Sequence, residues 1–155
     1  GSERSHTFHG RDVYAYTGAR LASGVINFDQ VGRLLKPSVM KIKYKKAKLK
    51  NKIISGNIPI LDAHYGNIWT NISIDLFDKL KLKINEMVWV IIKSNDQELF
   101  SKRVKYTSSF GGVDVGEPVI YVNDILNIGL AINQENMAEK YNINPGPDTV
   151  IEIWR

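Results

Sequence analysis

The segment Ile60–Ile72, with the sequence ILDAHYGNIWTNI, concentrates side chains that can recognise a small molecule. It contains a carboxylate at Asp62, a phenol at Tyr65, a carboxamide at Asn67 and an indole at Trp69. A strand that served only as core would alternate apolar residues with ordinary polar ones. The polar residues here instead offer an acceptor for an ammonium group, an amide for a base edge and flat aromatic rings. The segment is therefore the first candidate for a binding site.

Each of these side chains also has a purely structural interpretation, which the sequence leaves open. Asp62 can hold an ammonium group through a charge-assisted contact worth about 1.5–3 kcal/mol, or it can cap a turn. Asn67 can pair with the amino group and ring nitrogen of adenine, or it can be a turn amide after Gly66, where positive φ is allowed. Tyr65 and Trp69 can stack on a base for about 1–3 kcal/mol each, or they can belong to the core or the sheet surface.

The three histidines, His6, His9 and His64, are candidate metal ligands or bases. His64 is far from the other two along the chain, and neither cysteines nor suitably spaced carboxylates accompany them. We therefore expect no metal. Without a metal to acidify water, hydrolysis needs a side chain that orients or deprotonates the nucleophile, and a histidine can accept a proton near neutral pH.

The composition is that of a soluble globular protein. The 155 residues, 43% of them hydrophobic and 24% charged, suffice to bury a core. No apolar run approaches the roughly 20 residues that cross a bilayer, and no secretory leader is visible, so we expect no membrane association. The absence of cysteine excludes disulfides and thiolate metal sites and fits a cytoplasmic protein.

The formal charge of +5 and the pI near 9.3 are compatible with nucleic-acid binding. Much of the excess charge lies in Lys41–Lys52, where lysines alternate with less polar residues. This pattern predicts a strand with a lysine face and a bulge or break at Lys45-Lys46 that restores the register. Lysines also protect edge strands from pairing with other chains, and we favour this solvated edge over a nucleic-acid surface.

The N-terminal part of the chain predicts one helix and a connection. The helix is expected over Val13–Ser23, with Asp12 as its N-cap and Gly24 just past its end. Val25–Met40 has no clean period and contains glycine and proline, so it reads as a link between domains.

From Lys41 onward the pattern predicts short strands separated by turns. The expected elements are the segment Ile58–Ile72, a short helix capped by Ser73 and ending near Leu80, a hairpin of Met87–Lys93 and Gln97–Tyr106 turning at Ser94-Asn95-Asp96, a glycine-rich loop at Thr107–Glu117, strands near Pro118–Asn123 and Ile128–Ile132, a helical turn around Asn136–Tyr141, and a last strand at Thr149–Trp154. The chain should therefore be α+β and mainly antiparallel β, with a compact sheet or barrel-like domain.

Two separated segments resemble one family, the S-adenosylmethionine (SAM) hydroxide adenosyltransferases, which are related to fluorinases and chlorinases. Asp62 to Ile72 match the order D-x-x-(Tyr or Phe)-G-N-x-W-T-N-I, and Thr7 to Asp12 match the segment TFHGRD. The resemblance runs from about Ser5 to Trp154.

It implies three parts in this chain. Residues 1–24 would be the last helical segment of an N-terminal α/β domain that is otherwise mostly absent, 25–40 a linker, and 41–155 a barrel-like C-terminal antiparallel β domain.

The resemblance also implies site residues. Those expected to line the methionine and adenine ends of a SAM pocket are Asp62, Tyr65, Asn67 and Trp69, with Phe110 packing near adenine and Phe8 and Gly10 contributing from the N-terminal motif. His9 would be the histidine of a catalytic Asp–Arg–His set whose Asp and Arg lie in the absent half.

A weaker match adds two residues near the C-terminus. Tyr121–Asp124 and Ile132–Asn136 resemble the family segment Y-x-N-S-x-G-x-L-x-I-A-x-N-x-G-N, which brings Asp124 and Ile132 into the expected pocket. The sequence departs from that segment at Asp124, where serine is usual, and at Leu126, where glycine is usual. An aspartate there would repel a substrate carboxylate, although it could share the ammonium with Asp62.

The reaction implied by the resemblance is hydrolysis of SAM at the ribose C5′, giving adenosine and methionine without a metal. The resemblance further implies a homotrimer with its pocket between subunits. Because the Asp and Arg partners of His9 are absent, this chain alone should show essentially no turnover. Two alternatives remain: a SAM-dependent halogenase, and a basic β domain that binds nucleic acid through residues 41–52.

Overall fold

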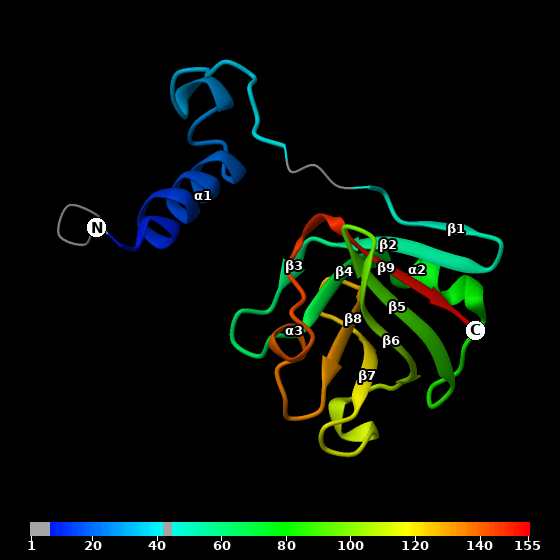
Figure 1. The fold of residues 1–155 in the computed structure, drawn as a ribbon. Helices are drawn as coiled ribbons and strands as arrows, with labels where there is room; N and C mark the ends of the chain where they lie inside the picture. Colours follow the sequence, from blue (N-terminus) through cyan, green and yellow to red (C-terminus); the bar gives the residue numbers. More distant parts are fainter. Residues whose placement is uncertain (1–6, 42–44) are drawn as a thin grey trace. The chain divides into compact units, whose positions relative to one another are not determined.

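The computed structural model describes residues 7–41 and 45–155. They belong to two compact units, Gly1–Lys41 and Ile42–Arg155. The first unit is helical and the second is a β domain (Figure 1). None of the described helices is long and apolar enough to cross a membrane.

One continuous helix dominates the first unit. A π-helical segment, η1 (Gly10–Ala15), runs directly into α1 (Tyr16–Ala22), and a short 3₁₀ turn, η2 (Phe28–Gln30), follows. The helix begins earlier than predicted, because the N–H of Asp12 already donates to the carbonyl of Phe8 at 2.9 Å. Asp12 therefore lies inside the first turn, and its prediction as the N-cap is wrong. The predicted end is confirmed: Gly24 has φ +72°, and the N–H of Val25 donates to the carbonyl of Arg20 at 3.0 Å.

The second unit is built on one sheet of nine strands, in the order β1-β2-β9-β5-β6-β7-β8-β4-β3. Neighbouring strands are antiparallel except for β6 and β7, which run parallel. The α+β, mainly antiparallel prediction is thus confirmed. The strands are β1 (Lys48–Lys50), β2 (Ile53–Ile58), β3 (Ile60–Leu61), β4 (Ile68–Ser73), β5 (Met87–Ser94), β6 (Gln97–Tyr106), β7 (Pro118–Val122), β8 (Asn127–Ile132) and β9 (Gly146–Trp154).

The sheet curls around a common interior but does not close, which corrects the predicted barrel (Figure 1). β2 and β4 approach each other at Gly56, where an added Cβ would lie 2.7 Å from Asn71 Oδ1. The Asn71 side chain bridges the gap: Oδ1 accepts from the N–H of Asn57 at 2.7 Å, and Nδ2 donates to the carbonyl of Lys45 at 2.7 Å. Because no backbone ladder joins β2 to β4, β1 and β3 remain the edges of the sheet.

The core lies on the concave side of the strands, and residue alternation decides which side chains enter it. Along β4, Ile68, Thr70 and Ile72 are buried while the residues between them are half-buried. The short helix α2 (Ile74–Phe77), the 3₁₀ turn η3 (Asp78–Leu80) and α3 (Met137–Lys140) cover the interior with the buried side chains Phe77, Leu80 and Met137. Ser73 caps α2 as predicted, with Oγ accepting from the N–H of Leu76 at 3.3 Å.

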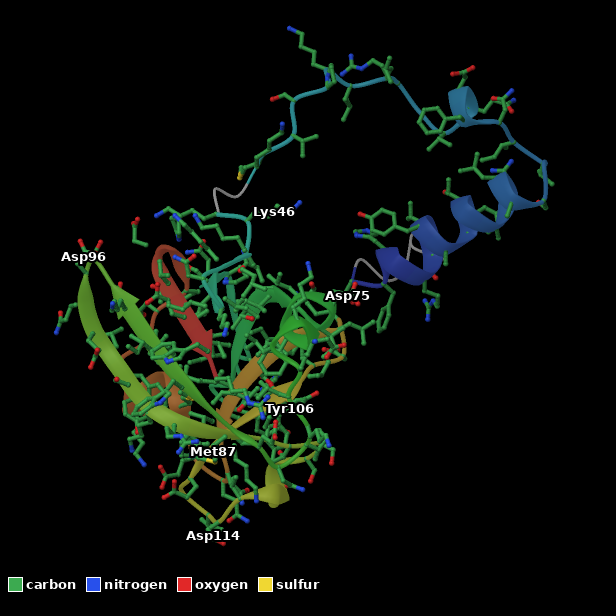
Figure 2. All side chains as sticks on the ribbon, turned by 90° about the vertical axis from the view of Figure 1, so that its right-hand side faces the viewer. Lys46, Asp75, Met87, Asp96, Tyr106 and Asp114 are labelled. Atoms are coloured by element: carbon green, nitrogen blue, oxygen red, sulfur yellow. The ribbon has the colours of Figure 1, made fainter. Side chains whose placement is uncertain are left out.

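Two tight turns form hairpins at opposite ends of the strands. β5 and β6 form the predicted hairpin, turning through Asn95 and Asp96 at φ +47° and +64°. Asn51 and Lys52 have φ +51° and +66° and join β1 to β2 in the same way. In Figure 2, Asp96 marks the tip of the β5–β6 hairpin and Met87 the opposite end.

The predicted lysine strand over Lys41–Lys52 is found only in part. Among the described residues of this segment, β1 (Lys48–Lys50) alone is a strand, and it is exposed at the sheet edge, as the edge-strand interpretation expected. Lys45 and Lys46 are not in a strand, so the predicted bulge is absent there; residues 42–44 lie outside the described part of the chain. The N–H of Lys45 donates to Asn57 Oδ1 at 2.9 Å, and the carbonyl of Lys45 accepts from Asn71 Nδ2. Side chains therefore bind the backbone groups of Lys45 that would otherwise pair with a neighbouring strand.

Candidate ligand-binding site

Four of the predicted site residues line one pocket of the β domain, with a volume of about 680 Å³. They are Tyr65, Asn67, Phe110 and Ile132. The rest of the wall consists of His64, Asn133, Gln134, Glu135 and Asn136. The volume lies within the roughly 300–1,000 Å³ typical of small-molecule sites. The fold thus brings together three segments that are far apart in the sequence.

Asn67 is held by its backbone and offers its side chain. Its carbonyl accepts from the N–H of Asp62 at 2.9 Å, and the residue is 8% exposed. Within the described residues, no hydrogen bond holds its side-chain amide, which lies in the pocket wall. A nearly buried amide with open donors and acceptor is suited to the edge of a heterocyclic base.

Asp62 starts the loop that carries Tyr65 toward the pocket. Its carbonyl accepts from the N–H of Gly66 at 2.7 Å, and its Oδ1 accepts from the N–H of His64 at 3.1 Å. The turn-capping interpretation of Asp62 is therefore confirmed. Among the described residues, its Oδ2 makes no hydrogen bond, so the same carboxylate can still receive a cation.

Gly66 fixes this loop against helix α3. It has φ +66°, and an added Cβ would lie 1.7 Å from Oδ1 of Asn136. Its carbonyl accepts from the N–H of Ala138 at 3.0 Å, while Asn136 Oδ1 accepts from the N–H of Glu139 at 2.9 Å and caps α3. Only glycine allows both the positive φ and this close packing, so Gly66 joins two walls of the pocket.

Trp69 lies beside the pocket rather than in its lining. Its side chain makes a hydrogen bond to Tyr121, whose ring centroid is 4.8 Å from that of Phe110. Gly129 pairs with both Trp69 and Tyr121 on the neighbouring strands, and an added Cβ there would lie 2.6 Å from Tyr121 Cζ. The missing side chain of Gly129 thus leaves room for Tyr121 to connect Trp69 to Phe110, a ring that lines the pocket.

Two carboxylates act on the Tyr121 hydroxyl. Burial raises the pKa of Tyr121 most, the hydrogen bond with Trp69 lowers it, and the negative charges of Asp62 and Asp124 raise it further. Asp62 and Asp124, which come from different loops, therefore both lie close enough to Tyr121 for their charges to act on its hydroxyl. Asp124 is exposed to solvent, and a cation placed between the two groups would be attracted by both.

The predicted residues of the N-terminal motif belong to the first unit. Phe8, His9 and Gly10 are exposed there, and the guanidinium of Arg11 lies 4.9 Å from the centroid of the Phe8 ring. The pocket described above is formed by the β domain alone. The roles of Phe8, His9 and Gly10 remain predictions, and His6 lies outside the described residues.

Sequence analysis did not assign Tyr121, His64 or the run from Asn133 to Asn136 to the site. The C-terminal segment contained a signal for Tyr121 and the asparagines, because both occur in the matched pattern, whereas His64 was considered only as a candidate metal ligand or base. In the described parts of the two units, no group of three or more His, Asp or Glu side chains is placed to hold a metal ion.

A family model for the SAM hydroxide adenosyltransferase C-terminal domain matches residues 56–150, more than half of the chain. The matched region contains the whole pocket lining. The chain belongs to the SAM hydroxide adenosyltransferase family. Its membership rests on this C-terminal domain, which holds Asp62, Asn67 and Trp69 in the order that the motif predicted.

Individual relatives of this family member agree with the match. A fluorinase from Actinopolyspora mzabensis is 28% identical over 143 residues, which cover 90% of this chain and 46% of that protein. An (R)-S-adenosyl-L-methionine hydrolase from Salinispora tropica is 26% identical over 149 residues, covering 94% of this chain and 51% of the hydrolase. The chain therefore spans about half the length of these relatives.

A solved structure has the same fold. The crystal structure of an uncharacterized conserved protein from Thermotoga maritima superposes with a TM-score of 0.70 at 32% sequence identity. The alignment covers 97% of this chain and 54% of that protein.

Proposed function

We propose that this chain supplies the C-terminal part of the substrate pocket of an enzyme that hydrolyses SAM to adenosine and L-methionine. The observation that supports the proposal most directly is the convergence of Tyr65, Asn67, Phe110 and Ile132 on one pocket. Family membership provides the substrate class, and the hydrolase among the relatives provides the reaction.

Each part of the proposed site has a distinct task, with Asp62 and Asp124 lying outside the pocket lining itself. Asn67 binds the edge of adenine, and the ring of Phe110, supported by Tyr121 and Trp69, packs against the nucleoside. Asp62 receives the α-ammonium of the methionine part, with the charge of Asp124 nearby. Ile132 excludes water, since it is only 3% exposed.

The reaction is a displacement at the ribose C5′. The oxygen of water forms a bond to C5′, the C5′–S bond breaks with its electron pair passing to sulfur, and the proton of water passes to a base. Methionine leaves as a neutral thioether, so the site mainly has to align the reactants, which can contribute about 7–11 kcal/mol. His9 is the proposed base, acting with an Asp and an Arg supplied from outside this chain.

The proposal extends to the assembly and the location. We propose a cytoplasmic homotrimer in the full-length protein, with each pocket completed by a neighbouring subunit, a small-molecule substrate and no metal. In this proposal the protein binds neither nucleic acid nor a membrane.

A SAM-dependent halogenase is the second candidate, because fluorinases are among the relatives. The histidine at position 9 favours hydrolysis. A halide needs no base, only a dry site with hydrogen-bond donors, whereas water becomes a better nucleophile when a base accepts its proton.

Product analysis of the full-length protein tests the reaction. Incubation with SAM should release adenosine, and chromatography should find no halogenated nucleoside even in high halide. The 155-residue chain should show essentially no turnover. Halogenated product would refute the hydrolase assignment, and rapid adenosine release by the short chain would refute the need for outside residues.

Ligand binding by the short chain tests the pocket itself. Adenosine should raise the melting temperature of the β domain, since a ligand that binds only the folded state stabilises it. Asn67→Asp should abolish this shift, because the donor to the base is lost. Asn95→Asp, the same substitution at the distant β5–β6 turn, should leave it unchanged. Equal shifts in both variants would remove Asn67 from the site.

A further inference from the structure

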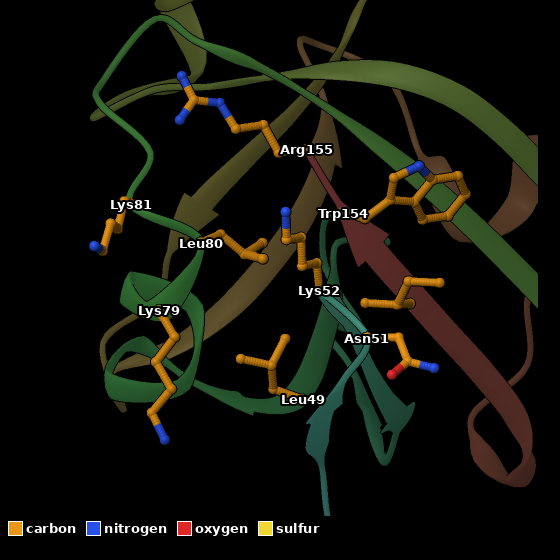
Figure 3. Close-up of a pocket in the computed structure, with 9 residues that line it drawn as sticks. Leu49, Asn51, Lys52, Lys79, Leu80, Lys81, Trp154 and Arg155 are labelled. Atoms are coloured by element: carbon orange, nitrogen blue, oxygen red, sulfur yellow. The ribbon is translucent and has the colours of Figure 1, made fainter.

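A second pocket, with a volume of about 690 Å³, lies at the other side of the β domain beside the β1–β2 turn. Its apolar lining consists of Leu49, Ile53, Leu80 and Trp154. Its remaining residues are Asn51, Lys52, Lys79, Lys81 and Arg155, and no acidic side chain lines it. Figure 3 shows Leu49 and Leu80 directed toward the middle, with Lys79 and Lys81 extending from the rim. None of these residues belongs to the SAM site proposed above.

The positive charges of this second pocket are largely uncompensated. Within the described part of the chain, Lys52, Lys79 and Lys81 form no ion pair, whereas Arg155 contacts Glu86 at 3.1 Å. Lys52 is fixed at the rim by the turn, where it has φ +66°. Exposed lysines are common, but apolar side chains at the centre of such a cluster are not needed to keep a protein soluble.

The apolar floor continues along the convex face of the sheet. Trp154 on β9 pairs with Trp89 on β5, and their rings stack with centroids 6.2 Å apart and planes 15° apart. Trp89 is 41% exposed and Ile53 is 37% exposed. Arg103 on β6 lies opposite Trp89, and Lys50 on β1 lies opposite Ile53, so cations flank this apolar strip at both ends.

We propose that this pocket is a docking site for an acidic peptide segment of another protein that carries an aliphatic anchor side chain. Charge complementarity selects the acidic partner, because three unpaired ammonium groups surround the pocket. Its size and its leucine and isoleucine lining select an aliphatic anchor, which would be removed from water next to Leu49, Ile53 and Leu80. The face-to-face contact between Trp89 and Trp154 occupies one ring surface of each indole, which makes the strip a poorer stack for successive bases of a nucleic acid.

A labelled peptide tests the charge requirement. The probe is a fluorescein-labelled peptide in which one leucine is flanked on each side by glutamates, titrated with the chain and followed by fluorescence anisotropy. The double variant Lys79→Gln, Lys81→Gln should weaken binding by roughly five- to tenfold, since it removes two exposed ion pairs. The double variant Lys46→Gln, Lys102→Gln removes the same charge from exposed sites outside the pocket and should change the Kd by less than about twofold. Equal weakening by both pairs would overturn the proposal, because it would show general attraction between opposite net charges.

The anchor is tested by pairing two substitutions. Replacing the leucine of the peptide by serine should weaken binding. Ile53→Ser in the protein should weaken binding of the leucine peptide and leave binding of the serine peptide unchanged. Additive losses from the two changes would overturn the assigned pocket. An oligothymidylate of equal charge that bound more tightly than the peptide would also overturn the proposal, in favour of a nucleic-acid surface.

Discussion

Gly66→Ala should disrupt the link between the Asp62 loop and helix α3. The new Cβ would lie 1.7 Å from Asn136 Oδ1 and 2.1 Å from its Cγ, so the Asn136 side chain must move. Moving it removes the cap of α3, which typically costs about 0.5–2 kcal/mol. Alanine at φ +66° costs roughly 1–2 kcal/mol more. We expect the free energy of unfolding of the β domain to fall by roughly 1.5–4 kcal/mol.

Urea denaturation followed by tryptophan fluorescence measures this change. All three tryptophans lie in the β domain, so the signal reports on that unit. Gly116→Ala is the matched control: Gly116 has φ +85°, but the nearest atom to its added Cβ is the flexible Glu135 Oε1 at 3.2 Å. This control variant should lose only the stability that the strained positive φ costs an alanine, about 1–2 kcal/mol.

A double-mutant cycle isolates the contact between Gly66 and Asn136. Asn136→Ala removes the group with which the new Cβ collides, so Gly66→Ala should cost less in that background than in the wild type. Equal costs in the two backgrounds would refute the collision argument. A loss no larger than that of Gly116→Ala would refute it as well, because only the backbone penalty would then remain.

Three further substitutions have defined outcomes. Leu126→Gly should stabilise the β domain by about 0.5–1 kcal/mol in urea denaturation, because Leu126 has φ +60° and is 64% exposed, whereas Ile125→Gly at the neighbouring exposed position should destabilise it. Tyr121→Phe should reduce the loss of stability in alkali, because the pKa of Tyr121 is raised in the folded state above its ordinary value of 10.0. The contribution of Tyr121 to the free energy of unfolding is therefore complete below pH 10 and is lost as pH rises through the folded-state pKa. An unchanged alkaline stability profile in the variant would contradict this. In the full-length protein, Asp62→Asn keeps an acceptor for the N–H of His64 but loses the charge, so calorimetry should show weaker binding of SAM with adenosine almost unaffected; equal losses would remove Asp62 from the ammonium site.

Much of the β domain could be predicted because its local signals agree with one another. The β5–β6 hairpin, the cap at Ser73 and the strands around Tyr121 and Ile128 lie where alternation and turn residues placed them. The closure of the sheet could not be predicted in the same way. It depends on whether β2 and β4 form a ladder, and that is decided by the side-chain bonds of Asn71 and the close approach at Gly56, which leave no local pattern.

The lysine-rich segment shows where alternation misleads. The spacing of its lysines suits a strand, yet the backbone of Lys45 is bound by the side chains of Asn57 and Asn71, and of the described residues in this segment only Lys48–Lys50 pair with β2. The prediction of Asp12 as an N-cap was wrong for a related reason, since a residue type that favours capping cannot cap a helix that has already begun one turn before it. Both errors come from contacts that compete with local propensity.

The site was predictable by segment and less so by role. Tyr65 and Asn67 line the pocket, whereas Trp69 lies beside it and makes a hydrogen bond to Tyr121. This contact depends on Gly129 in a third strand, which leaves room for the Tyr121 ring. Such an arrangement requires the register of β4, β7 and β8 together. A single sequence specifies each strand and leaves their order in the sheet open.

The loop that contains Asp124 keeps its geometry although its sequence departs from the family pattern. Asn123 Oδ1 accepts from the N–H groups of Ile125 at 3.2 Å and Asn127 at 2.9 Å, and Leu126 adopts the positive φ that a glycine would adopt without strain. The departure at Leu126 therefore affects stability rather than shape. Asp124 consequently occupies a defined place near Tyr121, where its charge adds to that of Asp62. In the proposed site this end attracts the ammonium of the substrate more strongly and its carboxylate less strongly than a serine would, so the carboxylate must be bound by donors from elsewhere.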